Sequence, residues 1–295
     1  MSDHAKGLLL TTLGVLVITP DALMIRLVSM DTWTLTFWRG LLSAIGLAIG
    51  LLAIHRGRFL AVMLAVGGWG LVIGTLFGIT TVTFVTAITT TTAANTLLII
   101  ATGSMFGALF SWFLLREPVL PRTWFAMAGT TVGVLVLVAS DLGAGRLFGD
   151  LMALATAALA GLTFTLIRKH ALTDMVPAVI FGGIVTALIA LPFCRPGEIL
   201  VEDMTILLVM GLLMLPLSFA LQFVGPRYIP APEVSLLVLL EAVLGPLLVW
   251  IWLGEHPGEW AFVGGAIVIA TLALHAVWGL RQETRRAQVT DERRA

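Results

Sequence analysis

The chain has 295 residues, of which 59% are hydrophobic and only 12% charged, with a formal net charge of zero and one cysteine. A typical soluble domain is about 25% charged, so the composition excludes an ordinary soluble enzyme. The net charge of zero gives no indication of nucleic-acid binding. A single cysteine excludes an internal disulfide and a cysteine-based metal site. The sequence predicts an all-α membrane protein, because apolar runs of this density satisfy their backbone hydrogen bonds within helices.

Ten apolar segments follow one another along the chain, separated by short polar stretches. Their predicted bounds are 7–24, 33–54, 60–88, 93–115, 124–139, 150–167, 176–193, 206–224, 234–253 and 260–280. About 20 apolar residues are needed to cross the hydrocarbon core of a bilayer, so we expect ten transmembrane helices. The third segment is too long for one straight span, and its start is expected near Ala65.

Lysine and arginine predict the orientation, because cytoplasmic loops carry an excess of them. With the N-terminus inside, three of the seventeen fall on outer segments, and Arg39 lies within a span. The remaining thirteen fall on inner segments: Lys6, Arg56, Arg58, Arg116, Arg122, Arg168, Lys169, Arg227, Arg281, Arg285, Arg286, Arg293 and Arg294. We therefore expect both termini in the cytoplasm.

The first two predicted spans carry opposite charges at similar depth. Asp21 lies about fourteen residues into the first span from its inner end, and Arg39 about six residues into the second from its outer end. We expect an ion pair, because buried opposite charges cost less together than apart. It would be either a fixed link between the helices or a gate at which Arg39 exchanges Asp21 for the carboxylate of a bound solute. Pro20 removes a backbone hydrogen bond and is a hinge candidate.

Three more residues are candidates for contact with a solute. Trp38 adjoins Arg39, and Trp69 lies toward the inner end of the third span. Either could form an aromatic wall for an apolar or aromatic solute, although such residues more often belong to a core. Asn95 lies in a threonine-rich hairpin, and its amide can both donate and accept hydrogen bonds. The polar groups of this hairpin can also satisfy the backbone where a helix breaks.

Glu241 is the one charge in the apolar run from Val234 to Leu253 and lies near its middle. A carboxylate at mid-membrane costs roughly 2.5–3.5 kcal/mol on insertion scales, so it needs a partner, a proton or a water-filled cavity. Glu241 is therefore a candidate functional residue. The alternative is a structural role, in which it caps a break in a neighbouring helix.

The sequence contains an internal repeat. Pairs of residues 138 positions apart align: Gly107 with Gly245, Trp112 with Trp250, and Glu117 with Glu255. Each copy holds five spans, and because five is odd the second copy must be inverted in the membrane. We expect a first five-helix repeat at 1–140, a connecting loop at 141–148, a second repeat at 149–280 and a charged cytoplasmic tail at 281–295. Inverted repeats of this kind favour a transporter whose substrate site lies at their interface.

Two motifs resemble those of the drug/metabolite transporter superfamily, EamA type. Residues 97–118, LLIIATGSMFGALFSWFLLREP, are similar to its fourth-helix motif, and residues 239–255, LLEAVLGPLLVWIWLGE, to its ninth-helix motif. Residues 37–40, FWRG, resemble its arginine-bearing second helix. The resemblance covers residues 7–280 and implies ten spans with both termini inside. The sequence departs from the family at Ala242, where proline is common, and at Pro20 and Asp21, where Trp-Gly is common.

The repeat and the resemblance together indicate a bacterial secondary transporter of the inner membrane that exports or exchanges small metabolites by alternating access. The resemblance implies amphipathic solutes such as amino acids, aromatic ones included. No cofactor, metal site or catalytic motif is expected, and protons are the candidate coupling ion through Glu241. A glutamate there is common to members with very different solutes, so we expect it to serve coupling or cavity architecture more than substrate choice. The alternatives are a multidrug efflux protein, a membrane-embedded enzyme or a structural membrane partner of another protein.

Overall fold

The computed structural model describes residues 3–116, 121–141, 146–170, 172–197, 201–224, 228 and 231–292. Every regular element within these ranges is helical. Residues 142–145 of the predicted connection, Glu117 of the repeat, and Arg227, Arg293 and Arg294 of the charge pattern lie outside the described residues.

The helices follow the predicted order of apolar segments. The half nearer the N-terminus holds α1 (Asp3–Ile18), α2 (Asp21–Leu27), α3 (Thr32–His55), η1 (Arg56–Arg58), α4 (Phe59–Ala65), α5 (Gly67–Thr90), α6 (Ala93–Ile100), α7 (Gly103–Leu115) and α8 (Pro121–Asp141). The other half holds α9 (Leu147–Lys169), α10 (Ala178–Ala190), α11 (Val201–Leu208), η2 (Val209–Met214), α12 (Leu215–Val224), α13 (Ala231–Leu253) and α14 (Glu259–Glu292).

Six of the helical segments described are long and apolar enough to cross a membrane: Ala5–Leu27, Thr32–Ala65, Gly67–Thr90, Ala93–Leu115, Leu147–Lys169 and Val201–Val224. Four shorter apolar helices coincide with the other four predicted spans: Trp124–Val136, Ala178–Ala190, Leu240–Leu253 and Glu259–His275. The molecule is thus a multi-span helical membrane protein. The third apolar segment, which is too long for one span, is divided in the structure. Its first residues form the short helix α4, and the long helix α5 begins at Gly67.

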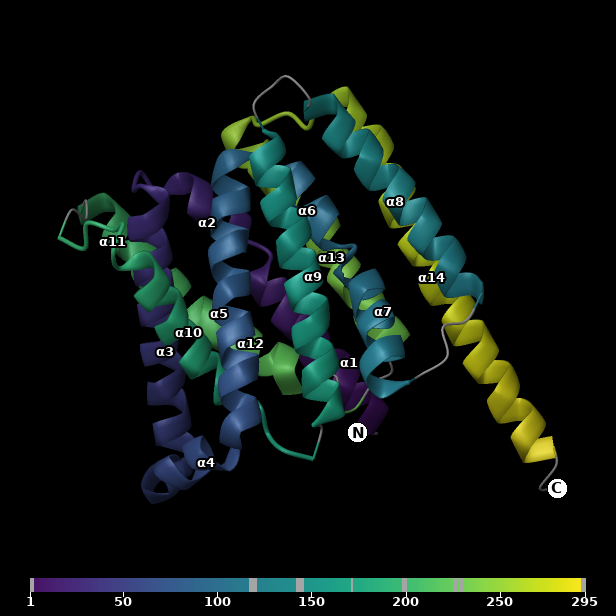
Figure 1. Cartoon of the computed structure of the whole chain (residues 1–295), viewed down its shortest axis with the longest axis horizontal. Helices are drawn as coiled ribbons and strands as arrows, with labels where there is room; N and C mark the ends of the chain where they lie inside the picture. Colours follow the sequence, from purple (N-terminus) through teal and green to yellow (C-terminus); the bar gives the residue numbers. More distant parts are fainter. Residues whose placement is uncertain are drawn as a thin grey trace.

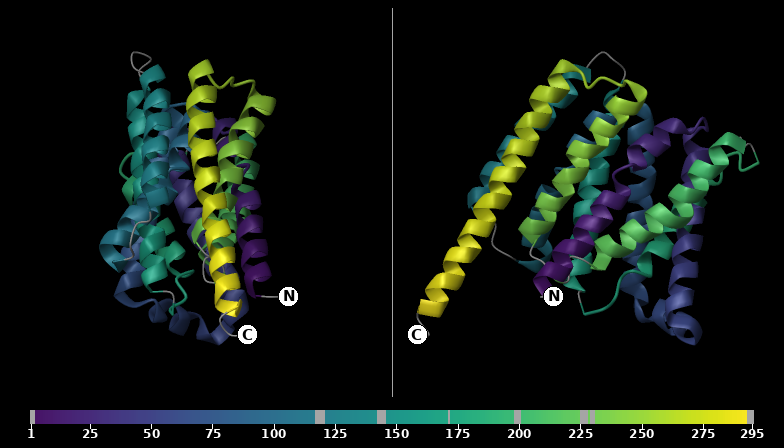
Figure 2. Two further views of the ribbon diagram at one scale, coloured as in Figure 1. Left: turned by 90° about the vertical axis from the view of Figure 1, so that its right-hand side faces the viewer. Right: turned by 180° about the vertical axis from the view of Figure 1, so that it is seen from behind.

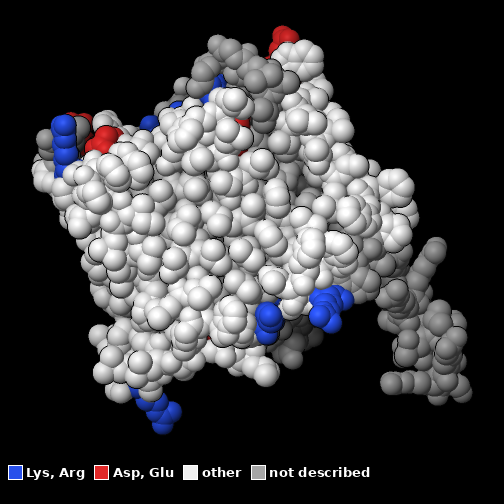
Figure 3. Space-filling view, in the orientation of Figure 1, with Lys and Arg blue, Asp and Glu red and all other residues white. Residues whose placement is uncertain are grey.

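The helices form one bundle with two distinct ends (Figure 1). Helix α1 begins and α14 ends at the lower end of the view, which we call the terminal end, while α2 and α11 lie toward the upper, opposite end. Helices α8 and α14 run side by side along one flank, and α14 continues beyond the bundle (Figure 2). On the face shown in Figure 3, charged side chains gather toward the two ends and the surface between them is almost uncharged. This distribution suits a protein surrounded by lipid at mid-height.

Two of the predicted spans are broken near their middle. The first divides between α1 and α2 at Thr19 and Pro20, because Pro20 has no N–H to donate one turn back. The fourth divides between α6 and α7 at Ala101 and Thr102. The Thr102 hydroxyl donates to Ile99 O (2.6 Å), and this bond helps to satisfy the backbone at the break.

The eighth predicted span contains a π-helical turn, η2, between α11 and α12. Pro216, just after this turn, cannot donate to the carbonyl of Leu212. That carbonyl lies against Gly46 of α3, where an added Cβ would be 2.5 Å from Leu212 O. Turns of this type occur mostly as single insertions within α-helices and are frequent at functional sites. The turn η2 packs on α3 close to Arg39.

Helix α10 packs between α3 and α5 through glycine contacts. A Cβ added to Gly183 would lie 2.6 Å from Gly40 O of α3, and one added to Gly74 of α5 would lie 2.6 Å from Ala178 O of α10. Small residues of this kind let helix backbones approach closely in a membrane. The resulting three-helix layer fixes the position of α3, and with it that of Arg39.

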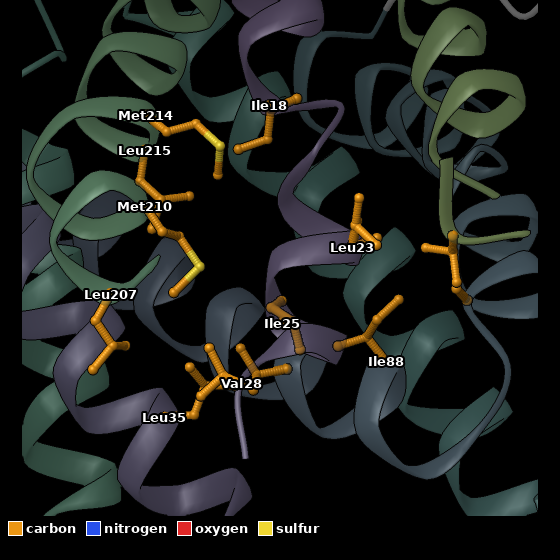
Figure 4. Packing of buried hydrophobic residues seen from close by; sticks show 14 of the residues in the cluster. Ile18, Leu23, Ile25, Val28, Leu35, Ile88, Leu207, Met210, Met214 and Leu215 are labelled. Carbon is orange, nitrogen blue, oxygen red and sulfur yellow. The ribbon is translucent and has the colours of Figure 1, made fainter. Parts of the chain in front are cut away.

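The main apolar cluster joins the broken first span to the helices of the second half. Figure 4 shows Ile18 at the end of α1 on the side of Met214 of η2, and Leu23 of α2 on the side of Ile88 of α5. The same cluster includes Leu97 of α6 and Val249 of α13. Burial of these side chains therefore holds the break at Pro20 between the two halves of the chain.

Helix α3 begins with a side-chain cap. Asp31 Oδ1 accepts hydrogen bonds from the backbone N–H groups of Trp33 (2.9 Å) and Thr34 (3.0 Å). Burial acts to raise the pKa of Asp31, but the hydrogen bonds from Thr34 and Trp33 and the charge of Arg195 outweigh it, so the pKa lies below its ordinary value. The cap is thus charged at neutral pH and stabilises the start of the helix that carries Arg39.

Candidate functional site

The centre of the candidate site is an ion pair between Asp21 and Arg39. Asp21 is the first residue of α2, directly after the break, and Arg39 lies in the second turn of α3. Arg39 Nη1 donates to Asp21 Oδ1, and Nη2 donates to Oδ2 (2.6 Å). Both side chains are 2% exposed. The ion pair predicted from the sequence is therefore present and is fully buried.

Other elements surround the guanidinium group of Arg39. Phe84 of α5 lies with its ring centroid 5.4 Å from Arg39 Cζ, a distance suited to cation–π attraction. Met210 of η2 places its sulfur 3.5 Å from Nη1. Arg39 Nε has no hydrogen-bond partner in the part of the chain that the structure describes. Helices from both halves of the chain thus meet at this one side chain.

Glu241 lies on the helix that packs against both breaks. Gly245, one turn after Glu241 on α13, faces the α1–α2 break, because a Cβ added there would lie 3.9 Å from Thr19 O. Ala242 belongs to a buried cluster with Ala101, which marks the break between α6 and α7. Glu241 is partly buried and lies on the same face of α13 as Gly245, one turn away. Two carboxylates and one guanidinium therefore share one region between the halves.

A second ion pair joins the two halves at the opposite end. Arg26, in the last turn of α2, donates through Nη2 to Thr91 O (2.5 Å) and to Glu255 Oε1 (3.4 Å). Glu255 Oε1 also accepts from the backbone N–H of Ala93 (3.0 Å), at the start of α6. We call Arg26, Thr91, Ala93 and Glu255 the outer cluster. It links α2, the α5–α6 hairpin and the segment between α13 and α14.

Two further contacts tie this end together. Both carboxylate oxygens of Asp203 on α11 accept from the backbone N–H of Ser29, at 3.3 and 3.2 Å. Asp150, in the first turn of α9, accepts from the Thr91 hydroxyl (2.8 Å). Each contact joins a segment of the first half to one of the second, so hydrogen bonds close the bundle at this end.

The structure separates the remaining predicted candidates. Trp38 packs on the main cluster and donates its indole N–H to Pro196 O (3.3 Å). Asn95 is buried in the first turn of α6, where its backbone N–H donates to the Thr92 hydroxyl (3.1 Å). Trp69 is 47% exposed and stacks on His170 with ring centroids 4.6 Å apart.

Trp69 is far from the ion pair. It precedes Phe84 by fifteen residues of α5, which is about 22 Å of helical rise. The structure therefore brings together Pro20, Asp21, Arg39 and Glu241. Trp38 is next to Arg39 in the sequence, but its indole N–H already donates to Pro196 O. Whether any of these residues contacts a substrate stays a prediction.

Several residues of the site had no signal in the sequence. Phe84 and Met210 look like ordinary core residues, and only the fold brings them to Arg39. Arg26 and Glu255 did carry a signal, because each is a charge next to a predicted span end and Glu255 recurs in the repeat as Glu117. Their pairing required knowledge of which span ends are neighbours in space.

Comparison with known proteins agrees with this architecture. The model of the EamA-like transporter family matches residues 5–139 and, a second time, residues 147–277. The uncharacterized transporter YvbV of Bacillus subtilis (strain 168) is 32% identical over 100 residues, which are 34% of this chain and 32% of the relative. The uncharacterized transporter YdfC of the same organism is 25% identical over 191 residues, 61% of each chain. Each match thus spans less than two thirds of the relative.

A crystal structure of another protein has the same overall architecture. It superposes with a TM-score of 0.68 at 18% sequence identity, over 93% of this chain and 98% of that chain. At this identity the similarity shows the fold alone, and it extends over nearly the whole length of both chains.

Proposed function

Because the chain belongs to the EamA-like transporter family, we propose that it is a secondary transporter of the bacterial inner membrane that exports or exchanges small metabolites by alternating access. Its family assignment points to transport of a small molecule across a lipid bilayer, and away from an enzyme. Amino acids, aromatic ones included, are the solute class that we propose.

We further propose ten membrane spans with both termini in the cytoplasm. The ten apolar helices, the location of the start of α1 and the end of α14 at one end, and the excess of basic residues on the inner segments support this topology. The two family matches, at 5–139 and 147–277, support two repeats at 1–140 and 149–280, joined by 141–148 and followed by a tail at 281–295. The terminal end is then cytoplasmic, and the outer cluster is periplasmic.

The observation that carries the proposal is the buried ion pair at a helix break between the two halves. Unpaired charges are expensive within a membrane, and those that occur mark transport pathways and proton relays. Broken helices at a repeat interface are where transporters bind their substrates. Asp21 and Arg39 lie at such a break, with Glu241 on the facing helix α13. A protein that only needed a stable core would have apolar side chains there.

Alternating access gives the outer cluster a role. In our proposal the structure corresponds to a state closed on the outer side by Arg26 and Glu255. Opening to the periplasm breaks this ion pair and the bonds from Ser29 to Asp203, which also cross between the halves. Pro20 is the proposed hinge, because α2 carries both Asp21 and Arg26 and can tilt about the break.

Glu241 is the proposed proton carrier. It is the carboxylate near the ion pair that has no positive partner of its own among the ion pairs described, and a proton would let it stay in the membrane without a counter-charge. Proton exchange at Glu241 would then couple solute movement to the pH gradient.

Counterflow into proteoliposomes tests the function. Purified protein is reconstituted in vesicles loaded with a mixture of unlabelled amino acids, and entry of each labelled amino acid is followed. We expect saturable accumulation of at least one of them, which empty vesicles do not show. A membrane-embedded enzyme or a structural partner protein would give no saturable exchange, and that result would contradict the proposal.

A further inference from the structure

The guanidinium group of Arg39 has a second edge that its ion pair with Asp21 does not use. A guanidinium group carries five N–H donors in a fixed plane. Asp21 takes one hydrogen atom from Nη1 and one from Nη2, which together form the end of the group. The side of the group, formed by Nε–H and the other Nη2–H, points in a different direction in the same plane.

Nε of Arg39 is a buried donor with no acceptor in the described part of the chain. The side chain is 2% exposed, so bulk water does not reach it freely. A buried donor without an acceptor is costly, and one beside an ion is more costly still. The neighbours Phe84, with its ring centroid 5.4 Å from Arg39 Cζ, and Met210, with its sulfur 3.5 Å from Nη1, have side chains without oxygen, so neither can accept from Nε.

We propose that the side edge of Arg39, Nε with Nη2, binds the carboxylate of the transported solute while Asp21 stays bound at the end of the same group. The two edges of guanidinium each match the spacing of two carboxylate oxygens, which is why arginine recognises carboxylates with two parallel hydrogen bonds. This inference rests on the proposed transport function and names the chemical group that the site selects.

The charges of the site specify the solute further. Asp21 and Arg39 neutralise one another, so a bare carboxylate added at the side edge would bring an unbalanced negative charge into the membrane. Glu241 lies on the face of α13 that packs on this break, because a Cβ added at Gly245, one turn further along the same face, would be 3.9 Å from Thr19 O. A solute that carries an ammonium group next to its carboxylate can place the positive group toward Glu241. The site therefore favours an α-amino acid over a simple carboxylic acid or an amine.

This arrangement differs from an exchange in which the solute displaces Asp21. In an exchange, Asp21 would be left in the membrane as an unpaired charge, and the cost of that charge would weaken solute binding. With two edges in use, Asp21 keeps Arg39 oriented and charged in every step. Asp21 is then a positioning residue, and Arg39 is the residue that contacts the solute.

Competition in the counterflow assay tests the carboxylate requirement. Labelled L-phenylalanine is the first probe, followed by the other labelled amino acids until one exchanges saturably. Unlabelled acid, its primary amide and the corresponding amine without the carboxyl group then compete for entry. We expect the amide and the amine to compete about 10- to 100-fold more weakly than the acid, the ratio for one or two charge-assisted hydrogen bonds.

The matched variants are Arg39→Lys and Arg58→Lys. Lysine at 39 can still pair with Asp21, but its ammonium has no side edge, so the preference for the acid over the amide should fall by about 10-fold or more. Arg58 is exposed in η1, and its replacement should leave the preference unchanged. Equal acid-to-amide ratios in the wild-type protein, or a ratio that Arg39→Lys leaves unaltered, would overturn the carboxylate site while the transport function stands.

A direct measurement covers the case in which Arg39→Lys does not fold. NMR spectra of the protein with 15N-labelled arginine side chains should show slowly exchanging Nε–H signals from Arg39 and from Arg26, whose Nε is also buried. The signal of Arg39 is the one that remains in Arg26→Lys. Saturation with the exchanged amino acid should move this proton downfield, and the amide should not. An unmoved signal with an amino acid that exchanges would refute the site. If no solute exchanges in any assay, the proposed function itself fails, and the inference with it.

Discussion

Arg39 and Asp21 face one another across the first helix break, with Nη2 of the arginine 2.6 Å from Oδ2 of the aspartate and both side chains 2% exposed. The pair joins α2 to α3 directly after Pro20, at the place where helices of the two halves meet. A buried pair of this kind contributes little net stability compared with apolar residues of the same size, but loss of one partner leaves an uncompensated charge. We therefore propose that the pair serves the transport cycle rather than stability alone.

The first prediction concerns the loss of one charge. Asp21→Asn should lower the stability of the protein by about 3–5 kcal/mol, because Arg39 is left charged and unpaired in the core. The double variant Asp21→Asn/Arg39→Gln removes both charges and should regain most of that loss. Thermal unfolding in detergent measures both effects. If the double variant were as unstable as the single one, the pairing energy would not explain the loss.

The second prediction separates exchange from coupling. Glu241→Gln removes the proposed proton carrier and keeps the shape of the side chain. Exchange of solute across vesicles without a gradient should persist with a weaker apparent affinity, because the ammonium group of the solute loses its charged partner. Accumulation driven by an imposed pH gradient should disappear. Measurements at several external pH values give the comparison. A Glu241→Gln protein with full gradient-driven accumulation and the pH dependence of the wild type would exclude Glu241 as the carrier.

The third prediction tests the outer cluster as a closure. In a Cys194→Ser background, Thr96→Cys places a thiol at a fully buried position of α6. Glu255→Gln weakens the ion pair to Arg26 and the bond from Ala93, so a membrane-impermeant maleimide should label the new thiol about 10- to 100-fold faster from outside, as expected for the loss of a charge-assisted hydrogen bond.

The matched control is Glu259→Gln. Glu259 is an exposed acidic residue in the first turn of α14, near the same end of the bundle. Its replacement should leave the labelling rate unchanged. Equal rates for Glu255→Gln and the unmodified background would show that the outer cluster does not control access.

The fourth prediction concerns the glycine contacts that hold α3. Gly183→Ala would place a Cβ 2.6 Å from Gly40 O and 2.9 Å from Ala44 Cβ, so the helices must separate. We expect a loss of about 1–3 kcal/mol, the range for overpacking of a close contact. Gly50→Ala, on the partner helix α3, meets no atom within 4 Å and should be neutral or slightly stabilising. Unfolding midpoints in detergent compare the two variants.

Much of the fold followed from the sequence, because lipid leaves few choices. Long apolar runs must be helices, and the described helices coincide with all ten predicted segments. The pair Asp21 and Arg39 was predictable from depth alone, since two opposite charges on adjacent antiparallel spans meet if their depths agree. Pro20 likewise favours a break in the first span. Pro216 and Pro246, by contrast, lie within α12 and α13 without dividing these helices.

Other features depend on tertiary contacts that the sequence does not encode locally. Nothing at Ala101 and Thr102 forces a break as proline does, and the close packing of Gly103 on Ala157 of α9 is a property of the assembled bundle. Phe84 reaches Arg39 only because α5 lies beside α3. Trp69 is a further example. Its position within a predicted span made it a candidate for contact with a solute, but in the structure its side chain is half exposed and lies against His170.

The central claim is that this protein moves a small solute through the site formed by Asp21, Arg39 and Glu241. The most direct measurement is amino-acid counterflow into proteoliposomes, compared between the wild-type protein and the folded double variant Asp21→Asn/Arg39→Gln. Our account predicts saturable accumulation of at least one labelled amino acid with the wild type, and none above empty vesicles with the variant. Accumulation that is equal for the two proteins, or absent from both, would contradict it.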